Sequence, residues 1–306
     1  MSLNNNDTKL KTAATIASVG TSFLLVTVKA FAAFFTGSLS VLSSMADSLS
    51  DVISSLISFI AVHYAAKPLS AEHRYGYGKA ESVSALLQAA FIVGSAGFIL
   101  YDGIYRFIYP QQIDETIVGI SIMIFCLFCT ILLVLFQRYV IKKTRSQAIA
   151  ADSLHYVVDI LSNSSVIFSL LIVRYLHWEW FDVVTAILIA LYLIYNAWQL
   201  ALEALQEITD KELDVKIKEN ITHLVCSVEG VLGCHDLRSR VSGSRWFVEI
   251  HLEFDGNKTL TETHALADSA EQKVIEAYPQ IQLIVHQDPH GLKENRIDNA
   301  IAENVS

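Results

Sequence analysis

Charged residues are scarce in this chain of 306 residues: they make up 17% of it, whereas hydrophobic residues make up 53%. So little charge in so apolar a sequence excludes a disordered chain and a purely water-soluble domain. The composition predicts instead a protein that crosses a membrane several times.

Cysteine is also rare, with four residues in the chain. Cys126 and Cys129 lie in an apolar run, and Cys226 and Cys234 lie in a segment that we expect to be cytosolic and reducing. Cysteines placed in this way form no disulfide framework. The spacing of Cys126 and Cys129 also suits a soft metal, but we interpret the pair as small core residues of a helix.

Six apolar runs are each long enough to cross about 30 Å of hydrocarbon. They lie near residues 13–35, 39–65, 83–108, 113–136, 149–175 and 181–205. The first run is too long for a signal peptide, so we expect no cleavable signal. Lysine and arginine gather in 67–79 and in 138–145, which we interpret as connections between runs. The positive-inside rule places both connections and both termini in the cytoplasm, in a multi-pass protein of the inner membrane.

Hydropathy falls beyond Asp210, and a small soluble domain begins. Its pattern predicts an α+β fold of order α-β-β-α-β, with elements near 215–228, 231–241, 245–254, 261–278 and 282–286. The expected organisation is a membrane domain in 1–208, a cytosolic domain in 209–290 and a polar, disordered tail in 291–306. From Thr209 onward, 17 acidic residues outnumber 10 basic ones, which argues against nucleic acid as a partner and is compatible with cations.

Two of the apolar runs carry pairs of metal-binding side chains four residues apart. Asp47 and Asp51 lie in the second run, and His155 and Asp159 lie in the fifth. Residues four apart share one face of a helix, so two such faces together would present three carboxylates and an imidazole, a set suited to Zn²⁺. Because an ionised carboxylate at bilayer depth costs at least about 2.5 kcal/mol, we interpret these residues as a transport site for metal.

A weaker candidate is Asp152. The words Ala46-Asp-Ser-Leu49 and Ala151-Asp-Ser-Leu154 are identical, and aligning them matches Asp47 with Asp152 rather than with His155. Since Asp152 falls near the start of its run, a role in capping the helix or in balancing its dipole is the more ordinary interpretation.

The soluble domain holds a second group of potential ligands. On a strand, residues two apart share a face, as His286 and Asp288 would in the last strand. Each histidine alone resembles an ordinary surface residue. Together, they predict a cytosolic metal cluster made by His235, His251, His264, His286 and Asp288.

These residues and their order resemble the cation diffusion facilitator family, in particular its bacterial zinc and ferrous-iron efflux branch. The resemblance covers about residues 10–289. It is carried by Gly37-Ser-Leu-Ser40, Ala46-Asp-x3-Asp51, His73-x-Tyr-Gly-x-Gly-Lys-Ala-Glu81, Ala151-Asp-x2-His-x3-Asp159, His235-Asp-Leu-Arg238 and Val285-His-Gln-Asp-Pro289. The family implies a homodimeric metal–proton antiporter in the lipid bilayer, not an enzyme, with six spans and a cytosolic domain of metallochaperone-like, ferredoxin-like fold.

Family positions carry over residue by residue. The resemblance assigns the transport site to Asp47, Asp51, His155 and Asp159. It assigns a binuclear cytosolic site to His235, His251, His264, His286 and Asp288. It also implies an outer position for Gln287 and a pair of opposite charges, Lys79 and Asp210, at the hinge between the two domains.

The chain departs from the family at the loop between the second and third runs. Relatives have an aspartate and two histidines there, and those positions are Ser70, His73 and Tyr77 in this chain. Only His73 can then bind metal, with Glu72 as a partial substitute. We expect this loop site to be weak.

The expected function is efflux of a divalent metal ion in exchange for protons. Metal ligands must be deprotonated, so metal and protons compete, and His155 is the natural proton carrier because an unperturbed histidine has a pKa of about 6.5. Zn²⁺ is the first choice, with Fe²⁺, Cd²⁺ and Co²⁺ as alternatives, because the proposed site has no thiolate for Cu(I) and its imidazole does not suit Mg²⁺ or Ca²⁺. A membrane metal sensor without transport is the rival function; a zinc protease is excluded by the lack of His-Glu-x-x-His.

Overall fold

The computed structural model describes residues 5–36, 39–108, 117–176, 180–292 and 296–299, without side-chain placement through most of 35–47 and 165–183. The chain divides into two compact units, Met1–Leu205 and Gln206–Ser306. Each unit has a hydrophobic core of its own.

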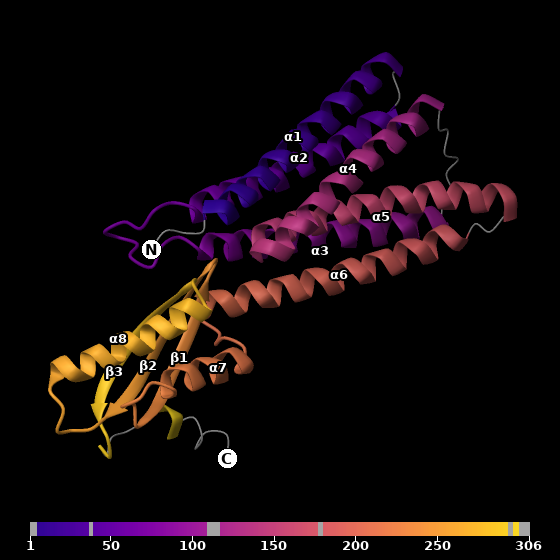
Figure 1. Cartoon of the computed structure of the whole chain (residues 1–306). Coiled ribbons are helices and arrows are strands. Elements are labelled where there is room, and N and C mark those ends of the chain that lie inside the picture. The colour runs from indigo at the N-terminus through magenta and orange to yellow at the C-terminus, as the bar shows by residue number, and fades with distance from the viewer. Residues whose placement is uncertain (1–4, 37–38, 109–116, 177–179, 293–295, 300–306) are drawn as a thin grey trace. The chain divides into compact units, whose positions relative to one another are not determined.

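The first unit is built from long helices (Figure 1), which are α1 Asn5–Thr36, α2 Leu39–Ala65, α3 Lys79–Ile108, α4 Ile117–Thr144, α5 Gln147–Leu176 and α6 Trp180–Ile208. Within the described residues, α1 to α4 and α6 contain stretches long and apolar enough to cross a membrane. Each of the six predicted runs coincides with one of these helices, so the predicted helical membrane domain is confirmed.

The predicted connection at 138–145 is mostly wrong, because α4 continues to Thr144. Its last turn contains Lys142 and Lys143, which are good helix formers with long stems that reach polar surroundings from a helix end. The turn to α5 is therefore short, and Arg145 has a positive φ of 50° there. The start predicted near residue 113 lies outside the described residues.

Polarity in the first unit is inverted relative to a water-soluble protein. Large apolar side chains are exposed along its helices, among them Phe31, Phe98, Phe128, Leu188 and Tyr195. Polar side chains are buried between helices, among them Ser18, Ser55, Ser58, Gln88 and Gln137. This distribution is what a bilayer requires, since hydrocarbon accepts apolar groups and offers no hydrogen bonds.

Small residues bring the helices together. α3, α5 and α6 share a core cluster rich in alanine, with Ala85, Ala89, Ala96, Ala151, Ala190 and Ala197. α1, α2, α4 and α5 meet in another cluster that includes Ala14, Val62, Val140 and Ile149. Small side chains allow close approach of membrane helices. Because α5 belongs to both clusters and also contacts α2, the two helices that carry the predicted ligand pairs lie side by side.

The second unit has the predicted order α-β-β-α-β, and the predicted α+β fold is confirmed. Its elements are α7 Val215–Cys226, β1 Gly233–Ser242, β2 Arg245–Phe254, α8 Leu260–Ala277 and β3 Ile281–Pro289. β1 pairs antiparallel with β2, and β2 pairs parallel with β3. Ile221 and Val225 of α7 and Val274 of α8 join one core cluster with Ile250 and Leu252 of β2. Both helices therefore cover the same face of the sheet (Figure 1).

Part of the tail that was expected to be disordered contacts this domain. The backbone N–H groups of Ile297 and Asp298 both donate to the carboxylate of Asp236. Asp298 in turn accepts from the backbone N–H of Asp236. Asp236 lies at a bulge of β1 with a positive φ of 51°, so the bulge turns a carboxylate and an N–H toward the tail.

A buried ion pair joins α1 and α3 near the helix ends that we predict to face the cytoplasm. Lys11 Nζ of α1 lies 2.7 Å from Glu81 Oε1 of α3, and the two side chains are only 9% and 5% exposed. The Ser146 hydroxyl, between α4 and α5, also donates to Glu81. One carboxylate thus holds three parts of the first unit.

We predict that Glu81→Gln destabilises the full chain by about 3 kcal/mol, because removal of one partner leaves a buried, uncompensated ammonium. Thermal unfolding in detergent measures the effect. Lys9→Met is the control, since Lys9 is an exposed lysine on the same helix. Adding Lys11→Met to Glu81→Gln should restore part of the loss. Equal melting of Glu81→Gln and Lys9→Met would show that the pair contributes nothing to stability.

Candidate metal sites

A first group of potential ligands lies between α2 and α5. Single donor atoms of Asp51, His155 and Asp159 all fall within 4.8 Å of one another. His155 Nε2 and Asp51 Oδ1 are 3.1 Å apart. Asp51 and His155 are 5% and 6% exposed, so the group lies inside the helical unit.

The helical spacing explains why these side chains meet. His155 and Asp159 are four residues apart on α5 and share its face, and that face is turned to Asp51 of α2. Asp47 lies one turn before Asp51 on α2, but its side chain is outside the described residues. Its role as the fourth ligand therefore stays a prediction.

The histidine of this group also has a ring nitrogen that makes no hydrogen bond within the described part of the chain. Nδ1 of His155 is buried without a hydrogen-bond partner among the described residues. A buried polar atom of this kind is costly, and a functional site is a common reason for retaining one. A divalent cation would accept two carboxylates and one imidazole nitrogen as ligands, so the residues fit a metal substrate.

Asp152 is placed differently from the expectation of a helix cap. Its carboxylate accepts hydrogen bonds from Ser18 of α1 and Gln137 of α4, the latter at 2.7 Å. The Ser55 hydroxyl of α2 donates at 3.4 Å and lies 2.8 Å from the Tyr156 hydroxyl. Asp152 is 1% exposed. It is therefore the centre of a buried network that joins four helices, and the capping interpretation is wrong.

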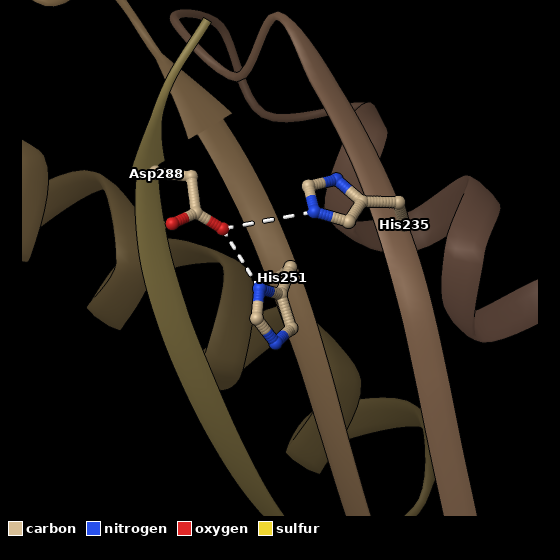
Figure 2. A group of neighbouring side chains, drawn as sticks. All are labelled: His235, His251 and Asp288. Atoms are coloured by element: carbon tan, nitrogen blue, oxygen red, sulfur yellow. Dashed lines mark hydrogen bonds and ion pairs between the residues drawn. The ribbon is translucent and has the colours of Figure 1, made fainter. Parts of the chain in front are cut away.

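A second group lies on the sheet of the second unit. His235 of β1, His251 of β2 and Asp288 of β3 again place donor atoms within 4.8 Å of one another. Figure 2 shows both imidazole rings beside the Asp288 carboxylate. Asp288 Oδ2 lies 2.7 Å from His251 Nδ1 and 3.7 Å from His235 Nε2. His235 and His251 are directly paired across the strands, so strand register brings this group together.

The remaining predicted ligands of this site are more peripheral. His286 is exposed on β3, with Nε2 3.2 Å from Asp288 Oδ1 and its ring 4.5 Å from that of His251. His264 is exposed on α8, where it lies 3.6 Å from Asp268. The structure does not bring His264 to the group of three. The Gln287 side chain accepts from the Thr263 hydroxyl at 2.7 Å, so it packs against α8.

Glu253 was missed by the sequence analysis. Its Oε1 lies 3.1 Å from His235 Nδ1, whereas Asp288 lies nearer the other ring nitrogen, Nε2. This contact is within ion-pair distance, and it places a second carboxylate beside the group. His290 and Arg296 each contact the same carboxylate at 2.7 Å. The signal in the sequence was strand alternation, because Glu253 follows His251 by two residues and shares its face.

The other predicted positions show local contacts. Ser70 Oγ lies 3.0 Å from the Tyr77 hydroxyl, and the His73 ring stacks on Tyr77 at 4.5 Å. Among the described residues, His73 belongs to no group of three potential ligands. Asp210 Oδ2 lies 3.7 Å from Arg240. The Lys79–Asp210 pair would join the two units and stays a prediction.

Contacts with His290 and Arg296 also set the acidity of Glu253. Burial by itself raises the pKa of this carboxyl, but the hydrogen bonds from His290 and Arg296 outweigh it, so the pKa is lower than usual. A carboxyl with a lowered folded-state pKa stabilises the fold above its unfolded pKa, and the contribution is lost as pH falls through the folded pKa.

We predict that Arg296→Met costs about 1 to 3 kcal/mol at neutral pH, because a nearly buried carboxylate loses a charged donor. Acid-induced opening of β1 and β2 should also begin at higher pH in this variant. Hydrogen-exchange protection factors for residues 233–254 of the full chain measure both effects. The matched control is Arg238→Met, which breaks an equally short contact, 2.7 Å to Glu249, between side chains that are 53% and 45% exposed. Identical protection in the two variants would contradict the prediction.

Family models match nearly the whole chain. The model described as "Cation efflux transmembrane domain" matches residues 15–209, and "Cation efflux protein, cytoplasmic domain" matches residues 213–290. The chain is 40% identical over 287 residues to the cation-efflux pump FieF of Citrobacter koseri, covering 94% of this chain and 95% of that protein. It is 39% identical to the pump of the same name from Salmonella choleraesuis, with the same coverage. A solved zinc-form structure of CzrB is 30% identical and covers 28% of this chain and 99% of its own, with a TM-score of 0.26.

Proposed function

Because the chain belongs to the cation efflux family, whose members are transporters and not enzymes, we propose that it exports divalent metal ions from the cytoplasm in exchange for protons. Zn²⁺ is the proposed main substrate, and Fe²⁺, Cd²⁺ and Co²⁺ are alternatives. The observation that carries the proposal is the group of Asp51, His155 and Asp159 between α2 and α5, in which Asp51 and His155 are buried.

The donor set supports the choice of metal. Two carboxylates and one imidazole, with Asp47 as the proposed fourth ligand, form an oxygen-rich set with one nitrogen. Such a set suits Zn²⁺ and similar divalent ions of borderline softness. No cysteine belongs to this group of described ligands, and Cu(I) favours thiolates.

Proton coupling follows from the same side chains. The ion binds neutral imidazole and ionised carboxylates, so protonation of any of them weakens metal binding. Protons that enter from outside the cell would then help to release the ion there. Their loss to the cytoplasm would prepare the site for the next ion. His155, which contacts Asp51 directly, is the proposed carrier of at least one proton.

The distribution of basic residues supports the proposed direction of transport. Basic residues lie near the connection between α2 and α3, with Lys67, Arg74 and Lys79, and at the end of α4. The positive-inside rule supports a cytoplasmic location for these ends, for both termini and for the second unit. Export across the inner membrane is the direction that this orientation supports.

The second unit is proposed to regulate transport as the cytoplasmic domain of a homodimer. The match to the cytoplasmic-domain family supports this role. Metal that binds His235, His251 and Asp288 more tightly in one conformation of the protein than in another would shift the equilibrium toward the first conformation. His286 and His264 are proposed to complete the site, and His73 is proposed as a weak loop site only.

Metal flux into proteoliposomes tests the function. We predict that wild-type protein moves Zn²⁺ in a direction set by an imposed proton gradient, and that Asp51→Asn and Asp159→Asn each reduce the flux more than about tenfold. Loss of a direct ligand should cost at least as much as loss of a residue that only orients one. Glu203→Gln is the charge-matched control, because Glu203 is an exposed acid of α6.

Two outcomes would contradict the proposal. Zn²⁺ binding without flux in the wild type would favour the rival function, a membrane metal sensor. Flux that persists in both aspartate variants would move the transport site elsewhere. Parallel assays with Fe²⁺, Cd²⁺ and Co²⁺ rank the substrates.

A further inference from the structure

Two cysteines of the second unit lie in direct contact. Cys226 is the last residue of α7, and Cys234 is the second residue of β1. Their Sγ atoms are 2.7 Å apart. Both are free thiols in the structure. Non-bonded sulfurs rarely approach so closely, so the backbone places these two atoms within reach of a covalent bond.

The surrounding core keeps the two sulfurs together. Val225, next to Cys226, is fully buried, and Cys234 packs partly buried against the same core cluster. Cys234 is also paired with Leu252 in the sheet. The chain between the cysteines turns at Gly230, which has a φ of 99°, a conformation that favours glycine. The contact is therefore a consequence of the fold and not of a flexible surface loop.

The pair is open to small molecules. Cys226 is exposed, and both cysteines line a cavity of about 580 Å³ together with Lys218, His223 and Asp298. A reagent of the size of a tripeptide could reach the exposed thiol from this side. The lining carries charges of both signs, with Lys218 beside Glu219 and Asp298.

Metal binding explains the pair less well. Among the described residues, neither cysteine belongs to a group of three potential ligands. A protein site for a borderline or soft metal ion holds it with three or four side chains. Two thiols in contact, with an exposed and a less exposed member, are instead typical of a pair that forms a reversible disulfide.

We propose that Cys226 and Cys234 form a redox modification site that takes a small-molecule disulfide as its oxidant. The Cys226 thiolate attacks one sulfur of that disulfide, forms a mixed disulfide and releases one thiolate. The Cys234 thiolate then attacks Cys226 Sγ, closes the Cys226–Cys234 bond and releases the second thiolate. The protein loses two electrons, the small disulfide gains them, and the two thiol protons pass to the released thiolates.

Closure requires little movement, because a disulfide bond is about 2.05 Å long and the two sulfurs need to move by less than about 1 Å. The bond would fix the backbone directly before His235, a residue of the sheet metal group. Reversible disulfides of this kind occur in reducing compartments as sensors. The site is independent of the proposed transport function and of the identity of the metal.

The test uses the full chain in detergent, stripped of metal with a chelator and incubated with oxidised glutathione. Alkylation of the remaining thiols, digestion and mass spectrometry then identify each cysteine. We predict a bridge between Cys226 and Cys234 that dithiothreitol reverses. Cys126 and Cys129, which lie in α4 of the membrane unit, should remain alkylated thiols and serve as the internal control.

Two variants test the order of the steps. Cys234→Ser should accumulate a mixed disulfide of glutathione at Cys226, because the second thiol is missing. Cys226→Ser should leave Cys234 a free thiol under the same conditions. Absence of the bridge in the wild type would overturn the proposal. Protection of both thiols from alkylation by added Zn²⁺, without a bridge, would assign the pair to metal binding and would also overturn it.

Discussion

A carboxylate enclosed by membrane helices must find its partners inside the protein, because hydrocarbon offers no hydrogen bonds and no counter-ion. The helical unit meets this requirement in different ways. Glu81 is paired with the Lys11 ammonium. Asp152 accepts hydrogen bonds from neutral hydroxyl and amide groups of three other helices. Asp51 contacts the His155 ring. Since every one of these contacts joins separate helices, the same bonds that make the buried charges tolerable also decide which helices pack together.

The partners of these buried carboxylates differ in whether a proton or a metal ion can take their place. Glu81 is paired with an ammonium of another helix, and the donors of Asp152 are neutral groups fixed on their own helices. The group of Asp51, His155 and Asp159 instead combines two carboxylates with an imidazole, whose Nδ1 atom is buried without a hydrogen bond among the described residues. Protons or a divalent ion can each balance its negative charge, but not both at full occupancy. The proposed antiport needs a site with two alternative ways of being neutralised, and the donors of this group fit that requirement.

Local patterns in the sequence predict much of this, and the limits have physical reasons. Long apolar runs predict the helices, and metal-binding side chains four residues apart inside such runs mark Asp51, His155 and Asp159. Alternation predicts the strands. The end of α4 is mispredicted because a lysine-rich segment can continue a helix as readily as end it. The setting of Asp152 is missed because its partners, such as Ser18 and Gln137, lie far away in sequence. Strand alternation places Glu253 on the face of His251, but its partners His290 and Arg296, which lower its pKa, lie far away in sequence.

The two candidate metal groups use similar donors on different supports, and the supports favour different tasks. His235, His251 and Asp288 lie on neighbouring strands whose hydrogen bonds fix the register. Ligands on such a sheet keep their spacing whether or not an ion is present, which favours retention of the ion. Asp51 and His155 lie on separate helices, α2 and α5, and no backbone hydrogen bonds join two helices. A small shift of one helix against the other would change the distance between these ligands. Release of an ion requires such a change, so the helix pair is the better support for transport and the sheet the better support for sensing.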